Sequence, residues 1–127
     1  MMLIHQGENS LYDVSIRIVD LEKFESIELK TLSDVREAET VINIGNLVPN
    51  MAQVLGGWQL PDTDMKRYNI FIAARNGIVT QLMRLKRVNG RWVGATRVEK
   101  ESTGKLEVLY EKVESQFPRD KNGNIQW

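Results

Sequence analysis

The residue types that most often carry out chemistry are scarce in this chain. It contains one histidine, His5, and no cysteine. Without cysteine there can be no disulfide, no thiolate zinc site and no thiol nucleophile. A single histidine cannot form a histidine cluster for a metal, and His5 lies near a terminus, where few elements could orient it in a catalytic triad. We therefore predict none of these sites.

General acid–base catalysis would have to use carboxylates. Aspartate is common at strand ends and turns, and for that reason alone the candidates are Asp13, Asp20, Asp62 and Asp64. The PDTD stretch could touch a hard cation, but a turn explains it without one. The tail segment DKNGNIQ begins like a calcium loop, yet its glycine is displaced and no glutamate completes the site, so we interpret it as a turn.

Nucleotide and hydrolase motifs are also missing. The chain has no G-x-x-x-x-G-K-[ST], no G-x-G-x-x-G and no G-x-S-x-G. We consequently predict no catalytic residue, no metal and no cofactor.

The composition is that of one ordinary globular domain. The chain has 127 residues, of which 42% are hydrophobic and 27% charged. No apolar run is long enough to span a membrane and no signal peptide is apparent, so the chain as given is expected to be soluble, either cytoplasmic or excised from an anchored protein. Its zero net charge hides an acidic first half and a basic second half, which we expect to offset one another on folding.

The first half predicts strands with little helix. Residues 11–21 (LYDVSIRIVDL) alternate and indicate a half-buried strand, and residues 24–32 favour a second one. Asp34 and Glu37 resemble a capping box for one or two helical turns. Residues 41–47 predict a strand with a bulge at Gly45, and residues 51–55 a helical turn.

Two Asn-Gly pairs organise the second half. Asn76-Gly77 and Asn89-Gly90 favour two-residue turns and hence a three-stranded meander over residues 68–100. In that register Ile72 faces Gln81 and Met83 faces Thr96. Both hairpins then direct the same residues of the middle strand inward, toward a core of Ile70, Ile72, Val79, Met83, Leu85, Trp92 and Val98. Residues 105–113 predict a further strand, and residues 114–127 a tail or capping hairpin.

The opposite face of the meander is the predicted contact surface, formed by Phe71, Leu82, Arg84, Lys86 and Arg97. The register places Phe71 beside Leu82, and Arg87 opposite Trp92 as a cation–π pair. A basic sheet with one aromatic side chain is too sparse to stack single-stranded nucleic acid, which makes that partner unlikely. Alternatively, a helix covers Phe71 and Leu82 and this face is a second core layer.

These strands predict an all-β, single-domain, antiparallel two-layer sandwich. The segments YDVSIRIVD, VINIGNLVPNMAQVL and YNIFIAARNG to RWVGATRV resemble immunoglobulin-like sandwich modules of uncharacterised bacterial proteins, which are often appended to membrane-anchored regions. The resemblance covers residues 11–113, lacks the Cys-Trp-Cys core of antibody domains and transfers no functional residue. It implies a non-catalytic recognition or spacer module whose partner is another protein or the rest of its own chain.

The alternative is an α+β fold of the cystatin-like or nuclear-transport-factor-like type, with the Asp34 and Met51 segments as helices on a curved sheet. Such a domain would offer a small-ligand or enzymatic pocket, here using Trp58, Trp92 and Asp62. These folds usually open with a long amphipathic helix, whereas residues 1–30 have a strand pattern.

Overall fold

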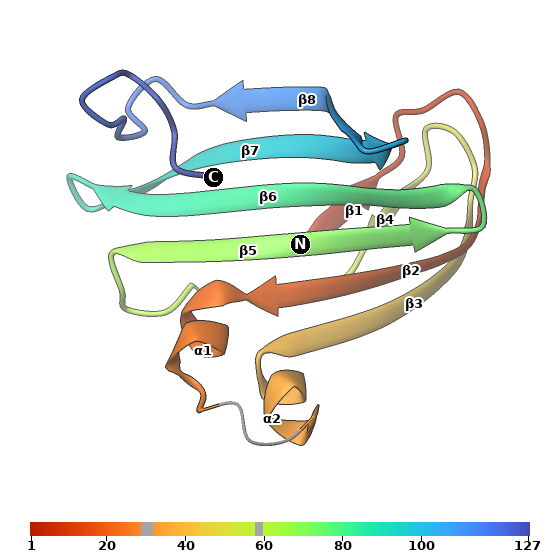
Figure 1. The fold of residues 1–127 in the computed structure, drawn as a ribbon, viewed down its shortest axis with the longest axis horizontal. Coiled ribbons are helices and arrows are strands. Elements are labelled where there is room, and N and C mark those ends of the chain that lie inside the picture. The colour runs from red at the N-terminus through yellow and green to blue at the C-terminus, as the bar shows by residue number, and fades with distance from the viewer. Residues whose placement is uncertain (29–31, 58–59) are drawn as a thin grey trace.

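The computed structural model describes residues 1–28, 32–57 and 60–127. Figure 1 shows a broad sheet of long strands with two short helices at one end. The elements are β1 (Met2–Ile4), β2 (Leu11–Asp20), α1 (Leu21–Ser26), α2 (Leu32–Glu37), β3 (Glu39–Leu47), β4 (Ala52–Val54), β5 (Met65–Ala74), β6 (Gly77–Val88), β7 (Arg91–Ser102) and β8 (Lys105–Val113).

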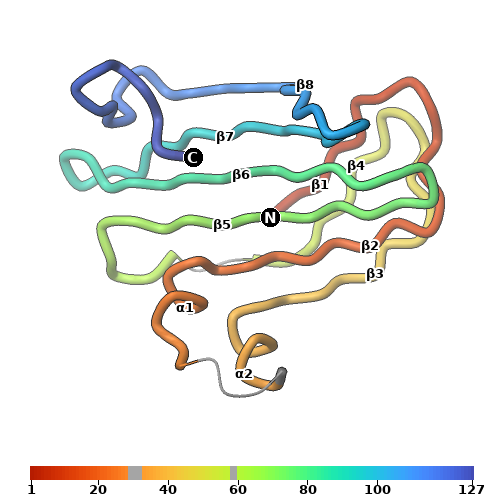
Figure 2. Tube along the Cα trace, viewed as in Figure 1, coloured from red at the N-terminus to blue at the C-terminus, as the bar shows by residue number. Residues whose placement is uncertain are grey.

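The strands form two antiparallel sheets, which confirms the predicted all-β class. The larger sheet has six strands in the order β3-β2-β5-β6-β7-β8, and the smaller one pairs β1 with β4. Figure 2 shows the segments before β2 and after β3 turning around the same end of the large sheet and running behind it. We call the face that β1 and β4 cover the inner face, and the opposite one the outer face.

The main core lies on the inner face. Alternate residues of β2 are buried there, and the cluster consists of Val14, Ile16, Ile18, Leu47, Tyr68 and Ile70. Met1, Leu3 and Leu55, in or next to the small sheet, pack against it. Of the predicted core, Ile70 is buried, Ile72, Met83 and Leu85 border the cluster, and Val79, Trp92 and Val98 are only half-buried. The core is centred on β2 because the small sheet covers that side.

The predicted bulge at Gly45 is confirmed. Val14 pairs with Gly45 and Ser15 with Asn43, which leaves Ile44 as the extra residue of β3. Gly45 has a φ of +85°, a conformation that glycine adopts without a steric penalty.

The second Asn-Gly pair turns the chain as predicted. Met83 lies opposite Thr96 and Arg87 opposite Trp92. Asn89 and Gly90 have φ values of 50° and 77°. Both values are positive, as a type I′ turn requires.

The register predicted from the first Asn-Gly pair is wrong by two residues. Ala74 pairs with Gly77 and Ile72 with Val79, so the turn consists of Arg75 and Asn76. The Arg75 amide donates to the Tyr12 carbonyl over 2.9 Å, which holds this residue at the end of β2. Because the shift is an even number, every side chain keeps its predicted face.

Two predictions in the first half are also wrong. The segment predicted as a second strand, residues 24–32, begins within α1, where the Asp20 carboxylate accepts from the Lys23 amide over 3.2 Å and caps the helix. Its residues 29–31 lie outside the described part of the chain. The predicted helical turn at 51–55 is instead strand β4, because the N-terminal segment supplies backbone partners such as Leu3 opposite Gln53. The helical turns near Asp34 are confirmed as α2, although Asp34 lies inside the first turn and not before it.

Within the described residues, no helix has the length and apolar character needed to cross a membrane.

Candidate functional site

The tail after β8 folds over the outer face near the Asn89-Gly90 turn. Phe117 is buried there against Val93 and Ala95, and Val88, Val113, Ile125 and Trp127 pack around them. Part of the outer face is thus a second core, as the alternative interpretation expected. The cover, however, is the tail and not a helix, and it lies over β7 instead of Phe71 and Leu82. We call residues 114–127 the tail cap.

Asp120 fixes the turn of the tail cap. Its carboxylate accepts from the amides of Asn122 and Asn124, each over 2.8 Å, and its own amide donates to the Asn124 carbonyl. Hydrogen bonding by the Asn124 amide is the main cause of the lowered pKa of Asp120, and the Asn122 amide adds to it. The DKNGNIQ segment is therefore a tight turn, and no group of three potential metal ligands occurs among the described residues.

Arg84 is a buried cation beneath the tail cap. Only 4% of the residue is exposed. Its guanidinium donates to the carbonyls of Tyr68 and Met83 and to the side-chain oxygen of Asn69, at 2.9–3.1 Å, while its Nε is buried without a hydrogen-bond partner. Burial lowers the pKa of Arg84, and the charge of Arg67 lowers it further. All its acceptors are neutral, and Arg84 forms no ion pair with the described residues.

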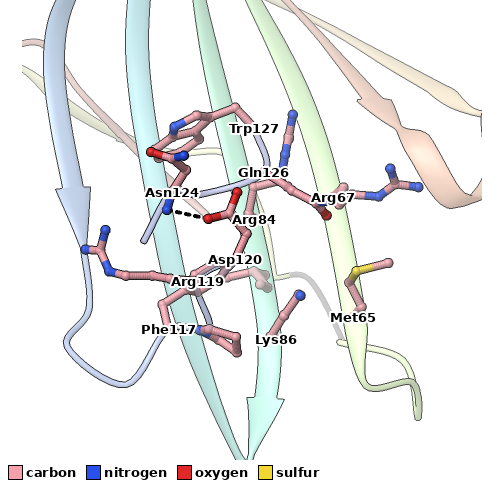
Figure 3. Close-up of a pocket in the computed structure, with 12 residues that line it drawn as sticks. Met65, Arg67, Arg84, Lys86, Phe117, Arg119, Asp120, Asn124, Gln126 and Trp127 are labelled. Carbon is pink, nitrogen blue, oxygen red and sulfur yellow. Dashed lines mark hydrogen bonds between the residues drawn. The ribbon is translucent and has the colours of Figure 1, made fainter. Parts of the chain in front are cut away.

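A cavity of about 230 Å³ lies between the sheet and the tail cap (Figure 3). Four cations line it: Arg67 from β5, Arg84 and Lys86 from β6, and Arg119 from the tail. Asp120 also lines it, and Phe117 and Trp127 supply apolar walls. Arg67 is neutralised by ion pairs with Glu22 and Glu25 of α1, whereas Lys86 and Arg119 have no such partner in the described chain.

The five residues of the predicted contact surface separate into three groups. Arg84 and Lys86 line the cavity. Arg97 donates to Glu111 of β8 over 2.8 Å, and it contacts the tail cap through the Trp127 ring, whose centre is 4.5 Å away. Phe71 pairs with Thr80 and Leu82 with Asn69, so Phe71 and Leu82 are not directly opposite each other, as the predicted register had them. Arg17 lies over the Phe71 ring at 4.6 Å.

The inner face holds a second buried cation, Lys66, which was not among the residues predicted from the sequence. Its ammonium donates to Asp20 over 2.7 Å, and the two side chains are 9% and 15% exposed. They line a cavity of about 400 Å³ together with Ile18, Ala38 and Tyr68. Burial raises the pKa of Tyr68 to about 12, and the charges of Asp20 and Glu22 add to the shift. The sequence does indicate that Lys66 faces inward, because it lies two residues before Tyr68 on the same strand.

The remaining sequence candidates lie at the surface. The side chain of Asp62 is 98% exposed and binds Arg87 over 3.0 Å. Arg87 in turn lies 5.2 Å from the centre of the Trp92 ring, which confirms the predicted cation–π pair. Asp13 forms an exposed ion pair with Arg75, and the Asp64 carbonyl accepts from the Arg87 amide. Trp58 lies outside the described residues.

Strand β8 is an edge with unusual apolar exposure. It pairs with β7 alone among the described strands. Its large apolar side chains are exposed on both faces: Leu106 60%, Val108 48%, Leu109 49% and Tyr110 48%. A bulge at Leu109 interrupts the pairing, since Val98 lies opposite Tyr110 while Glu99 lies opposite Val108.

Comparison of the chain with family models, with curated proteins and with solved structures found no match in any of the three.

Proposed function

We propose that the protein is a non-catalytic interaction module and that β8 is its contact strand, pairing with β8 of a second copy of the chain. The observation that carries the proposal is the exposure of four large apolar side chains along this edge strand. An edge strand presents unpaired backbone N–H and C=O groups, and natural proteins usually protect such edges. Adding a strand at the edge satisfies these groups and buries the side chains.

The symmetry of such a dimer restricts the register. A two-fold axis perpendicular to the sheet joins two β8 strands antiparallel and keeps each inner face beside the other inner face. Opposed residues must therefore lie on the same face. Glu107, Tyr110 and Lys112 are on the inner face, because they pair with Lys100, Val98 and Thr96. Leu109 also lies there, since it lines an inner-face cavity with Ile72 and Val79.

One register fits both faces and the charges. With the axis between Leu109 and Tyr110, these two residues oppose each other and Glu107 opposes Lys112 on the inner face. Leu106 opposes Val113 on the outer face. A regular strand would direct Leu109 and Tyr110 to opposite faces, so the bulge makes this register possible. Opposite charges and apolar pairs across strands each contribute roughly 0.2–1 kcal/mol.

A charge swap tests the dimer. Wild-type protein is expected to dimerise in sedimentation equilibrium. Glu107→Lys turns two symmetric attractive pairs into repulsive ones, so Kd should rise about tenfold. Adding Lys112→Glu should restore dimerisation, because each pair between the chains then has opposite charges again. The repulsion between the new lysine at position 107 and Lys100 within one chain persists in the double variant, so the recovery can come only from the contact between chains.

Glu37→Lys, an exposed reversal next to β3, is the matched control and should leave Kd unchanged. A monomer at every concentration would contradict the proposal. So would a dimer that Glu107→Lys leaves intact.

The proposal extends to the relation with immunoglobulin-like sandwich modules, which implies a recognition or spacer role. Antiparallel strands in two layers support it at the level of fold class. The six-and-two division of strands departs from the more even sheets of those modules.

The alternative, a small-ligand pocket, is favoured by one observation, the inner-face cavity of about 400 Å³ beside Asp20 and Lys66. Asp62 and Trp92 do not supply it with polar groups, because they meet at Arg87 on the surface. Screening a small-molecule library by thermal shift tests this alternative. A hit should lose its effect in Tyr68→Phe or Asp20→Asn and keep it in Glu101→Lys, an exposed reversal that does not line this cavity.

A further inference from the structure

The buried ammonium of Lys66 has donor capacity that its surroundings do not use. A lysine ammonium can donate three hydrogen bonds. Within the described residues Lys66 Nζ donates one, to Asp20 Oδ2 over 2.7 Å. The Lys66 side chain is only 9% exposed, so bulk water has little access to the other two N–H groups. Two donors of a buried cation are therefore open to a further acceptor.

This ammonium lies beside the inner-face cavity of about 400 Å³. Lys66 lines the cavity, and so do the two groups next to its Nζ: the Asp20 carboxylate, and the Tyr68 ring, whose centre is 6.0 Å away. Asp20 is held in place, because its Oδ1 accepts from the Lys23 amide and its own amide donates to the Ala38 carbonyl over 2.9 Å. The ion pair thus fixes the position of the ammonium before a ligand binds.

The charges that line this cavity balance. Two carboxylates line it, those of Asp20 and Glu37. Two ammonium groups, those of Lys23 and Lys66, also line it, so the net charge is zero. Tyr68 adds no charge at neutral pH, because burial raises its pKa to about 12. A charged ligand would lose hydration here without gaining a counter-charge, and the balance therefore favours an uncharged one.

We propose that this cavity binds a small uncharged carbonyl compound, a ketone or an ester, whose oxygen accepts from Lys66. The unused groups of Lys66 are donors only, so the ligand must supply the acceptor, and a carbonyl oxygen does so without a competing donor. Ile18, Ala38 and Pro61 provide apolar walls for the hydrocarbon part of the ligand. The inference rests on the small-ligand alternative given above and is independent of the dimer.

An NMR titration of isotope-labelled protein tests the ligand class with probes of similar size. Acetophenone has the carbonyl group, α-methylstyrene has CH2 in place of the oxygen, and benzoate carries a charge. Acetophenone should bind about tenfold more tightly than α-methylstyrene, because only the ketone accepts a hydrogen bond from the charged donor. Benzoate should bind more weakly than acetophenone, since its charge has no counter-charge in the cavity. A titration with methyl benzoate then shows whether the ester or the ketone binds more tightly.

A substitution of the donor tests the role of Lys66. In Lys66→Met, acetophenone and α-methylstyrene should bind equally. Lys86→Met makes the same change at a half-buried lysine of the outer face and should keep the preference of the wild type. Because Lys66→Met leaves Asp20 buried without its counter-ion and may not fold, the Cε signal of Lys66 in the wild type is a second readout. It should shift with acetophenone and not with α-methylstyrene.

The possible failures are distinguishable. Equal affinities of acetophenone and α-methylstyrene for the wild type, or tightest binding by benzoate, would overturn the ligand class and leave the small-ligand pocket in place. A preference for acetophenone that persists in Lys66→Met would overturn the role of Lys66. If none of the four probes bound, both the ligand class and the small-ligand alternative would be wrong. The dimer is tested separately, by sedimentation.

Discussion

Among the described residues, each face of the sheet buries one cation, and the two cations differ in the acceptors of their hydrogen bonds. Lys66 on the inner face is 7% exposed and Arg84 on the outer face 4%. Lys66 donates to the carboxylate of Asp20, whereas Arg84 donates to neutral oxygens. The ion pair has a structural role, because removing either partner would leave the other charge buried without a counter-ion. A buried guanidinium whose acceptors are all neutral leaves no carboxylate unpaired when it is replaced.

The largest effect is expected at the pair. Asp20→Asn leaves Lys66 buried without its counter-ion, so the free energy of unfolding should fall by about 3–5 kcal/mol in urea denaturation. Asparagine still caps α1, which separates the ion pair from the cap. Adding Lys66→Met should recover part of the loss. If Asp20→Asn costs under about 1 kcal/mol, the paired cation is no more sensitive than the unpaired one, and the contrast between the faces fails.

A smaller effect is expected at Arg84. Arg84→Met leaves no carboxylate unpaired and removes a desolvated charge. Its cost should be limited to the lost hydrogen bonds, about 1–3 kcal/mol of unfolding free energy. Thermal and urea denaturation measure it against Arg91→Met, an exposed control. A cost equal to that of Asp20→Asn would mean that Arg84 is paired in solution.

The smallest effect concerns the tail cap over Arg84. The folded-state pKa of Asp120 is lowered, so its contribution is present above the unfolded value near 3.8 and disappears as pH falls through the folded pKa. Tryptophan fluorescence, compared with that of a Trp127→Phe variant to isolate the signal of Trp127, should report loosening of the cap in that acidic range, before the core of the inner face unfolds. Asp120→Ala should abolish the acidic transition and show a looser cap at neutral pH. If the wild type and Asp120→Ala gave the same dependence of fluorescence on pH, Asp120 would not be the group whose protonation loosens the cap.

The alternation of apolar and polar residues predicted most of the sheet, because successive side chains of a strand point to opposite faces. They predicted β2, β8 and the second hairpin, where Asn89 and Gly90 both need positive φ. They could not place the first hairpin, since a shift of two residues preserves both faces. The pairing of β1 with β4 was also beyond reach, because it joins segments about fifty residues apart through backbone hydrogen bonds.

The candidate site was only partly predictable for a similar reason. Arg84 and Lys86 were predicted to lie on the outer face, because the alternation of residues along the strand is enough to assign a face. That Arg84 is buried depends on the tail cap, where Phe117 and Trp127 are anchors in a segment rich in polar and turn residues. Lys66 was missed because a lysine on the inner face is explained only by its partner Asp20, which lies forty-six residues away in the sequence.

The irregular edge strand β3 limits further assembly of the proposed β8–β8 dimer. Joining two chains through β8 leaves a strand β3 at each outer margin of the enlarged sheet. β3 has its own irregularity at Gly45, and α2 lies against it. Growth should end after a single addition, giving a closed pair in place of a fibre.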